Sequence, residues 1–417
     1  LQGVALLLSR TGTDEELILS KWALKQTFPM QSTVFSLCQQ LAQIISRLNL
    51  KSGEFQIKLV LASDPAMHGT LAQNDLLNFD FQQRSLLLID GQKNVWSFDR
   101  DQETRNLLEE AQQALSCEQP ETVQVLSLAV QTTTSRFQIV NRPRAELGTE
   151  IRPAGVAGTF YPADPARMTA QLDELFNEKV DAQPWAAAMV PHAGWKYSGK
   201  IAACVLNRIQ LPSTIIVIGP KHTRDGVDWA VAPHQAWQLP GGNLNSDRAL
   251  IQKLAEQIPG LELDAAAHRS EHAIEVELPL IQRLAPNAKV VGIVIGSGNL
   301  PRCEEFAAGL ARVIQEMPEP PLLLISSDMN HFATDKENRR LDELALEKMR
   351  SLDPEGLLAT VREHHISMCG VLPAVIVMKT LQKMGKLSQI EQVGYATSGD
   401  VTGDSSRVVG YAGLLIN

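Results

Sequence analysis

Three histidines in the C-terminal two thirds of the chain each follow a short apolar run, at a turn rich in Pro, Gly or Ser. They are His192 after residues 186–190, His222 after residues 214–218, and His331 after residues 321–325. Any one of them alone would more often be an ordinary loop histidine, hydrogen-bonded or exposed. Three together favour a metal or acid/base site, because neutral imidazole is the commonest metal ligand and a general base near neutral pH.

Cys369 is the best candidate for a third metal ligand. A thiolate supplies the negative charge that a pair of histidines lacks, and it suits iron, copper or zinc. A buried apolar cysteine is the alternative interpretation. His365 lies four residues earlier, so a helix here would place it on the same face, where it could lower the pKa of the thiol.

The segment 268–279 contains His-x-x-Glu-His, the inverted form of a zinc-protease motif. We do not favour a protease, because Ser270 is typical of a helix N-cap, which would leave His268 outside the helix. We expect instead a helix from Ser270 that points His272 and Glu275 toward the strand ends. Its core-facing residues would be Ile274, Leu278, Ile281 and Leu284. A solvated, charged first turn is the alternative.

The apolar runs of this region alternate with helical segments, which predicts an α/β sheet flanked by helices. The runs are residues 186–190, 214–218, 289–295, 321–325 and 392–396. In such sheets the ligand site forms outside the strand ends, so the polar residues that follow these runs are the first candidates for a site. No internal repeat is visible in the sequence.

Two domains are expected from a chain of 417 residues. Residues 1–145 alternate strand-like runs with an amphipathic stretch, which predicts a small α+β domain of unassigned role. Residues 131–149 are polar and are interpreted as a linker. Residues 151–417 would form the second domain. The lone His68 is interpreted as a loop residue.

The composition argues for a protein without a nucleic-acid or membrane partner. The net charge is -9 and no run of Lys or Arg is present, whereas nucleic acids and anionic membranes call for a basic face. No apolar run approaches the roughly 18 to 20 residues that span a bilayer. Five scattered cysteines without a CxxC pair indicate no disulfide framework, so a cytoplasmic location is expected.

Several separated motifs in residues 151–417 resemble the Memo family, known in bacteria and archaea as AmmeMemoRadiSam system protein B. The matching stretches, in order, are Gly158-Thr159-Phe160-Tyr161-Pro162, the Pro-His-Ala-Gly-aromatic-x-Tyr-Ser-Gly stretch at 191–199, Gly219-Pro220-x-His222, Glu271-His272-x-Ile274-Glu275 with Leu278-Pro279, Ser326-Ser327-Asp328 with His331, and Cys369-Gly370. Chance agreement at so many places is negligible.

The resemblance implies a fold similar to that of the class III extradiol dioxygenases, which hold Fe(II) with two histidines and a carboxylate. Memo proteins place a cysteine where that carboxylate stands. Carried over position by position, it implies that the metal ligands are His192, His222 and Cys369, and that Asp328, His331 and His272 surround the same pocket. This sequence keeps all six residues.

The resemblance leaves the activity open, because Memo proteins are described both as redox-active metal proteins and as scaffolds in signalling. We favour a non-heme oxidoreductase that uses Fe(II), with copper or zinc as alternatives, acts on a small molecule, and uses His331 as its acid/base. The alternative is an adaptor whose pocket recognises a peptide or protein. A zinc hydrolase is a third interpretation. Fold kinship does not transfer a reaction.

Overall fold

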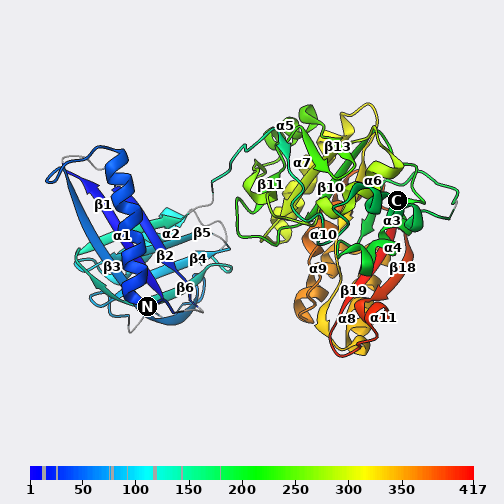
Figure 1. The fold of residues 1–417 in the computed structure, drawn as a ribbon. Helices are drawn as coiled ribbons and strands as arrows, with labels where there is room; N and C mark the ends of the chain where they lie inside the picture. Colours follow the sequence, from blue (N-terminus) through cyan, green and yellow to red (C-terminus); the bar gives the residue numbers. More distant parts are fainter. Residues whose placement is uncertain are drawn as a thin grey trace. The chain divides into compact units, whose positions relative to one another are not determined.

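The computed structural model describes residues 1–11, 16–24, 27–74, 76, 79–91, 93–115, 120–141, 144–178 and 180–417. The chain divides into two compact units, Leu1–Pro143 and Arg144–Asn417 (Figure 1). Each unit has its own hydrophobic clusters. The two units are therefore described one at a time.

In its described residues, the first unit is one antiparallel sheet with two helices. Its elements are β1 (Gly3–Arg10), β2 (Glu16–Trp22), α1 (Met30–Arg47), β3 (Phe55–Thr70), β4 (Arg84–Asp90), β5 (Lys93–Asp99), α2 (Thr104–Leu115), β6 (Gln124–Thr132) and β7 (Arg136–Asn141). The strand order is β2-β1-β3-β6-β4-β5-β7. The buried residues of α1 include Leu37 and Leu41, which pack on Val4 and Leu6 of β1.

This unit repeats one arrangement of elements. The order β1-β2-α1-β3 is followed by the same order in β4-β5-α2-β6, and the equivalent strands β3 and β6 pair antiparallel at the centre of the sheet. The sheet order on one side of this pair mirrors the order on the other. The repeat lies in the topology, and the sequence showed no trace of it.

Two expectations for this part of the chain were wrong. The polar segment 131–149 is not a continuous linker, because Arg136–Asn141 forms strand β7 and pairs with β5. Residues 142 and 143 of that segment lie outside the described residues. His68 is not in a loop but in β3, where its Nε2 lies 2.8 Å from Ser127 Oγ.

The second unit is an α/β fold, as expected. Its elements are β8 (Ile151–Arg152), α3 (Pro165–Leu175), β9 (Ala187–Val190), α4 (Trp195–Leu206), β10 (Thr214–Pro220), β11 (Trp229–Val231), β12 (Ala236–Leu239), β13 (Gly242–Asn245), α5 (Arg248–Gln257), β14 (Glu262–Leu263), the 3₁₀ helices η1 (Ala266–His268) and η2 (Glu275–Glu277), α6 (Leu278–Leu284), β15 (Lys289–Ile295), α7 (Leu300–Gln315), β16 (Leu322–Ser326), β17 (His331–Ala333), α8 (Asp335–Arg350), α9 (Pro354–Glu363), α10 (Val371–Lys383), β18 (Ile390–Thr397), α11 (Ser398–Thr402) and β19 (Val408–Ile416).

The apolar runs of the sequence form the main sheet of this unit, whose order is β14-β11-β15-β10-β16-β9-β19-β17 with β18 on β19. The central strands β15, β10, β16 and β9 are parallel. Parallel strands buried on both faces are continuously apolar, and all residues of β9, β10 and β16 are buried. The carboxyl ends of these strands therefore lie along one edge.

Helices cover both faces of this sheet, with a separate core on each. One core contains Ile216 of β10 together with residues of α5, α7, α8, α9 and α10. The other contains Val217 together with residues of α3, α4 and α6. The alternation of neighbouring residues between the two cores is the two-residue period of a strand.

The helix expected from Ser270 was wrong. Residues 266–277 contain only the short 3₁₀ helices η1 and η2, and the α-helix begins at Leu278, directly before Pro279. A proline at the first turn of a helix is favourable because it has no N–H to leave unsatisfied. His365 and Cys369 do not share a helical face, because His365 has a φ of +51° and both residues lie between α9 and α10.

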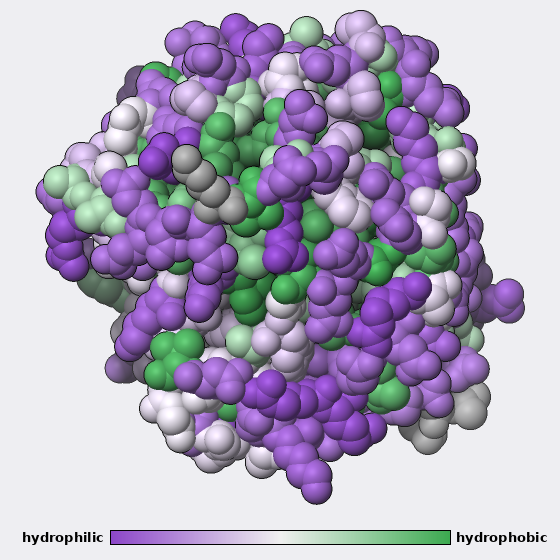
Figure 2. Space-filling model, turned by 90° about the vertical axis from the view of Figure 1, so that its right-hand side faces the viewer, coloured by the Kyte–Doolittle hydropathy of each residue, from purple (hydrophilic) through white to green (hydrophobic). Residues whose placement is uncertain are grey.

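In the described part of the chain, no helix is long and apolar enough to cross a membrane. On the face drawn in Figure 2, hydrophobic residues form small groups separated by hydrophilic ones. Cys38, Cys204, Cys303 and Cys369 are free thiols, and Cys117 lies outside the described residues.

Candidate metal centre

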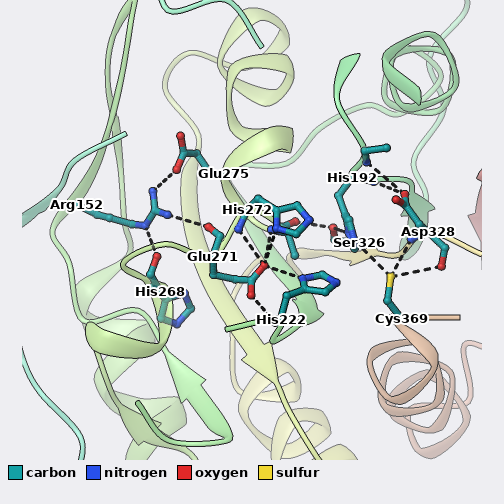
Figure 3. Close-up of polar contacts among 12 residues, drawn as sticks. Arg152, His192, His222, His268, Glu271, His272, Glu275, Ser326, Asp328 and Cys369 are labelled. Carbon is teal, nitrogen blue, oxygen red and sulfur yellow. Dashed lines mark hydrogen bonds and ion pairs between the residues drawn. The ribbon is translucent and has the colours of Figure 1, made fainter. Parts of the chain in front are cut away.

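Three neighbouring parallel strands deliver the site residues at their carboxyl ends (Figure 3). His192 lies two residues after β9, and His222 lies two residues after β10. Strand β16, between those two, ends at Ser326 and is followed by Asp328. The loop formed by residues 264–277 brings His272 next to His192 and His222.

One ring nitrogen from each of His192, His222 and His272 lies within 4.8 Å of the others, and this is the group of possible metal ligands found in the described part of the chain. The rings of His222 and His272 are stacked with their centroids 4.5 Å apart. His192 meets both rings edge-on, at 5.2 Å. Three imidazoles at these distances can surround a single ion.

The ring of His192 is fixed by a serine. Ser326 Oγ lies 2.5 Å from the carbonyl oxygen of Ala273, to which it donates its only proton. It must therefore accept from His192 Nδ1, which is 2.7 Å away. This assigns the proton to Nδ1 and leaves a lone pair on Nε2. Burial, with the neighbouring His222, lowers the pKa of His192 well below its usual value, so the ring is neutral.

The ring of His222 is fixed by Glu271. Its Nδ1 lies 2.9 Å from Glu271 Oε1, and its backbone N–H donates to Oε2 at 2.5 Å. Burial opposes ionisation of Glu271, but hydrogen bonds from His222 and from the Ala273 N–H outweigh it and lower the pKa to about 2. The carboxylate is therefore charged and orients His222 with Nε2 free, as carboxylates do for metal-binding histidines.

His272 shares this carboxylate. Its Nδ1 lies 3.2 Å from Glu271 Oε1, and its ring is stacked between His222 and Phe160, whose centroid is 4.6 Å away. Burial lowers the pKa of His272 to about 4. His192 and His272 are thus neutral at pH 7, the form in which histidine binds a metal.

Cys369 lies on the His192 side of the group. Its Sγ is 3.3 Å from His192 Nε2 and 3.2 Å from the backbone nitrogen of Asp328, which donates to it. The sulfur is not among the atoms within 4.8 Å of all three histidines. Burial, with nearby Asp328, raises the pKa of the thiol, so a thiolate requires a cation beside it.

Two further carboxyl groups, those of Asp328 and Glu277, are buried. Burial raises the pKa of Asp328 to about 7, although the N–H groups of His192 and Ala193 partly offset it. Glu277 is fully buried, and neither of its carboxyl oxygens has a hydrogen-bond partner in the described structure. Burial and Asp328 raise the pKa of Glu277 well above its usual value. It is therefore neutral.

His331 lies at the rim of this group. Its backbone N–H donates to Ser367 Oγ, and its Nδ1 lies 2.9 Å from the Ser367 carbonyl, to which it donates. Nε2 is left free to accept a proton. Burial and the nearby His222 lower the pKa of His331, so the ring is neutral and basic in character near pH 7.

A buried arginine holds the loop that carries Glu271 and His272. Arg152 is 1% exposed, and it donates to the carbonyls of His268 and Glu271 at 2.8 Å each and to Glu275 at 2.5 Å (Figure 3). Glu275 also accepts from the N–H groups of Gly155 and Val156 and from the hydroxyl of Tyr161. Glu275 thus anchors the loop instead of facing the strand ends.

The structure brings most of the sequence-predicted site residues together. His192, His222 and His272 form the close group, with Cys369, Asp328 and His331 around it. His268 is buried away from the group, beside Trp237, so the protease motif does not form a site. Sequence reasoning missed the roles of Ser326, Glu271, Glu277 and Arg152. For Ser326 and Glu271, the signal that could have suggested a role was their place within the motifs Ser326-Ser327-Asp328 and Glu271-His272.

The known proteins that resemble this chain match its second unit. A family model described as Memo-like protein matches residues 152–415. A MEMO1 family protein of Aquifex aeolicus is 38% identical over 268 residues, covering 64% of this chain and 98% of the relative. Relatives of the same name from Methanobrevibacter smithii and Sulfolobus acidocaldarius are 34% and 33% identical, each over 63% of this chain and 98% and 97% of the relative. The chain belongs to the Memo family.

Proposed function

We propose that this protein binds one transition-metal ion at the histidine group and acts as a metal-dependent oxidoreductase. The observation that carries the proposal is the anchoring of the three rings: each Nδ1 faces Ser326 or Glu271, and each ring is held in place. A carboxylate or hydroxyl that holds one ring nitrogen leaves the other directed at a shared point, which is how proteins orient metal-binding histidines.

The donor set favours iron or copper over calcium or magnesium. Imidazole and thiolate ligands suit Fe, Cu and Zn, whereas Ca²⁺ and Mg²⁺ prefer oxygen. We propose Fe(II) as the native ion, held by His192 and His222, with Cys369 and His272 as the further ligands. A bound cation would stabilise Cys369 as the thiolate. In the protonated form, the thiol has His192 Nε2 and the Asp328 carbonyl as neighbours.

A bound iron or copper ion would supply electron transfer and a binding position for substrate. The chain itself would supply proton transfer through His331, whose Nε2 is free, while Ser367 holds the other nitrogen. The ring of Phe160 stacks on the His272 ring and shields that face from water. We also propose that the second unit is related in fold to the class III extradiol dioxygenases. We propose further that the protein is cytoplasmic and acts on a small molecule.

Cobalt substitution tests the ligand set directly. Co²⁺ added to the metal-free chain should give one site per chain, with a sulfur-to-metal charge-transfer absorption that disappears in Cys369→Ser. If Cys369→Ser leaves the spectrum unchanged, the three histidines hold the ion without the thiol. If His331→Gln keeps the metal and the spectrum, its role lies in proton transfer rather than in ligation.

Failure to bind any ion would favour the second candidate, an adaptor that uses the same pocket to recognise a peptide or protein.

A further inference from the structure

The rim of the site carries an aromatic residue in an unusual backbone conformation. Phe332 lies between His331 and Ala333 of β17, where pairing with β19 shifts register, so it is the extra residue of a β-bulge. Its φ is +68°, in the left-handed region that bulky L-residues rarely adopt. Glycine is the usual residue at such a position.

Burial does not compensate for this conformation. Phe332 is 62% exposed, so an apolar side chain gains little from the core here. Its ring contacts the ring of His331, with centroids 5.7 Å apart, and the guanidinium of Arg407, at 4.4 Å. Strained backbone that the surrounding fold maintains is found mainly at functional sites.

A row of side chains leads from the metal centre to this exposed ring. His331 lies close enough to His192 and His222 for the pKa of each to depend on the others, and Phe332 is the next residue. The bulge therefore turns Phe332 outward while it keeps His331 at the metal centre. Re-aiming a side chain is a recurrent use of bulges beside active sites.

Arg407 gives the rim a positive charge. It is exposed, and in the described part of the chain no carboxylate forms an ion pair with it. A guanidinium stacked on a ring still offers N–H groups in its plane, which match the two oxygens of a carboxylate. The exposed ring next to it offers a face for stacking.

We propose that Phe332 and Arg407 form a recognition rim for an aromatic carboxylate, with the ring stacked on Phe332 and the carboxylate held by Arg407. This deepens the proposed function by naming a ligand class for the metal centre. It rests on the proposed function only for the claim that the end of the ligand away from the rim meets a bound metal ion. Binding at the rim does not need the metal, so the two ideas can fail separately.

Three small probes test the rim in the full chain, once metal-free and once after reconstitution. They are 3-phenylpropanoate, its cyclohexyl analogue with the same charge, and 3-phenylpropan-1-ol with the same ring and no charge. Dissociation constants are measured by ligand-observed NMR. We expect 3-phenylpropanoate to bind about two- to tenfold more tightly than the cyclohexyl analogue, and more tightly than the alcohol.

Two variants separate the ring from the charge. Phe332→Leu should abolish the preference for the aromatic ring and keep the preference for the anion, whereas Arg407→Gln should do the reverse. The matched controls are Phe35→Leu, which removes a ring that is 65% exposed in the first unit, and Arg100→Gln, which removes another guanidinium placed over a phenyl ring. The controls should change neither preference.

Phe332→Gly separates recognition from stability. If the ring is kept for binding, this variant should lose the ring preference while its melting temperature stays the same or rises, because the strain is relieved. A lower melting temperature with unchanged binding would overturn the proposal in favour of a structural role.

Other results would also overturn it. They are wild type that binds none of the probes or shows no ring preference, and a control variant that loses the preference as Phe332→Leu does. If the metal-free chain binds with the expected preference but takes up no metal, the rim stands and the proposed function fails.

Discussion

Each histidine of the candidate metal centre has one nitrogen that faces a fixed neighbour. Ser326 holds His192, and Glu271 holds His222 and lies beside His272. Because these contacts hold one nitrogen of each ring, the rings are oriented before any ligand arrives, which lowers the entropic cost of binding. The sequence predicted the histidines but not these anchors, because serine and glutamate are common on any surface.

Glu271→Gln tests the anchoring. Glutamine cannot carry the charge that accepts the Nδ1 proton of His222, so the ring loses its orientation. We expect metal affinity to fall about 10- to 100-fold, as measured by competition with a coloured chelator. Glu262→Gln, at an exposed glutamate of β14, is the matched control and should leave affinity unchanged. Equal affinity in both variants would contradict the anchoring role.

Glu277 makes a separate prediction about pH. Its pKa in the folded state is raised well above the usual value, so its contribution to stability is present below the unfolded pKa and is lost as pH rises. Glu277→Gln removes the need for a proton. The variant should be more stable than wild type by roughly 1–3 kcal/mol at pH 7, and by much less at pH 4.

Thermal unfolding at the two pH values measures this difference. Glu262→Gln should show no such dependence. A Glu277→Gln variant that is destabilised equally at both pH values would mean that the carboxyl is charged and has a partner.

The strands of the second unit could be predicted because their burial on both faces makes them continuously apolar. The run 289–295 matches β15 residue for residue. The loop 264–277 could not be predicted in the same way, because its conformation depends on Arg152, more than 100 positions away along the chain. Local spacing favoured a helix from Ser270, and these long-range hydrogen bonds override that preference.

Arg152→Lys tests whether the hydrogen bonds of Arg152, in β8, fix the conformation of this loop. Lysine keeps the charge but cannot donate to His268, Glu271 and Glu275 at once. We expect a loss of about 3 kcal/mol of unfolding free energy, because the buried Glu275 loses its partner, together with weaker metal binding. Arg269→Lys, at an exposed pair with Glu146, should cost ~0–1 kcal/mol. Equal effects would contradict this role for Arg152.

Across the chain, the sequence predicted the α/β fold and the Memo family of the second unit, but not the repeated topology of the first. The two halves of that sheet share an order of elements without a shared residue pattern, since a strand or helix needs only apolar residues at the right period. The first unit carries its own core and lies outside the residues that match the Memo family.

The most direct test is the metal content of the chain purified without chelator or affinity-column metal. Wild type should carry close to one iron or copper ion, and His192→Ala, His222→Ala and Cys369→Ala should each lose it while they keep their folded circular dichroism. A wild-type chain that stays empty after anaerobic reconstitution with Fe(II) would contradict the metal centre.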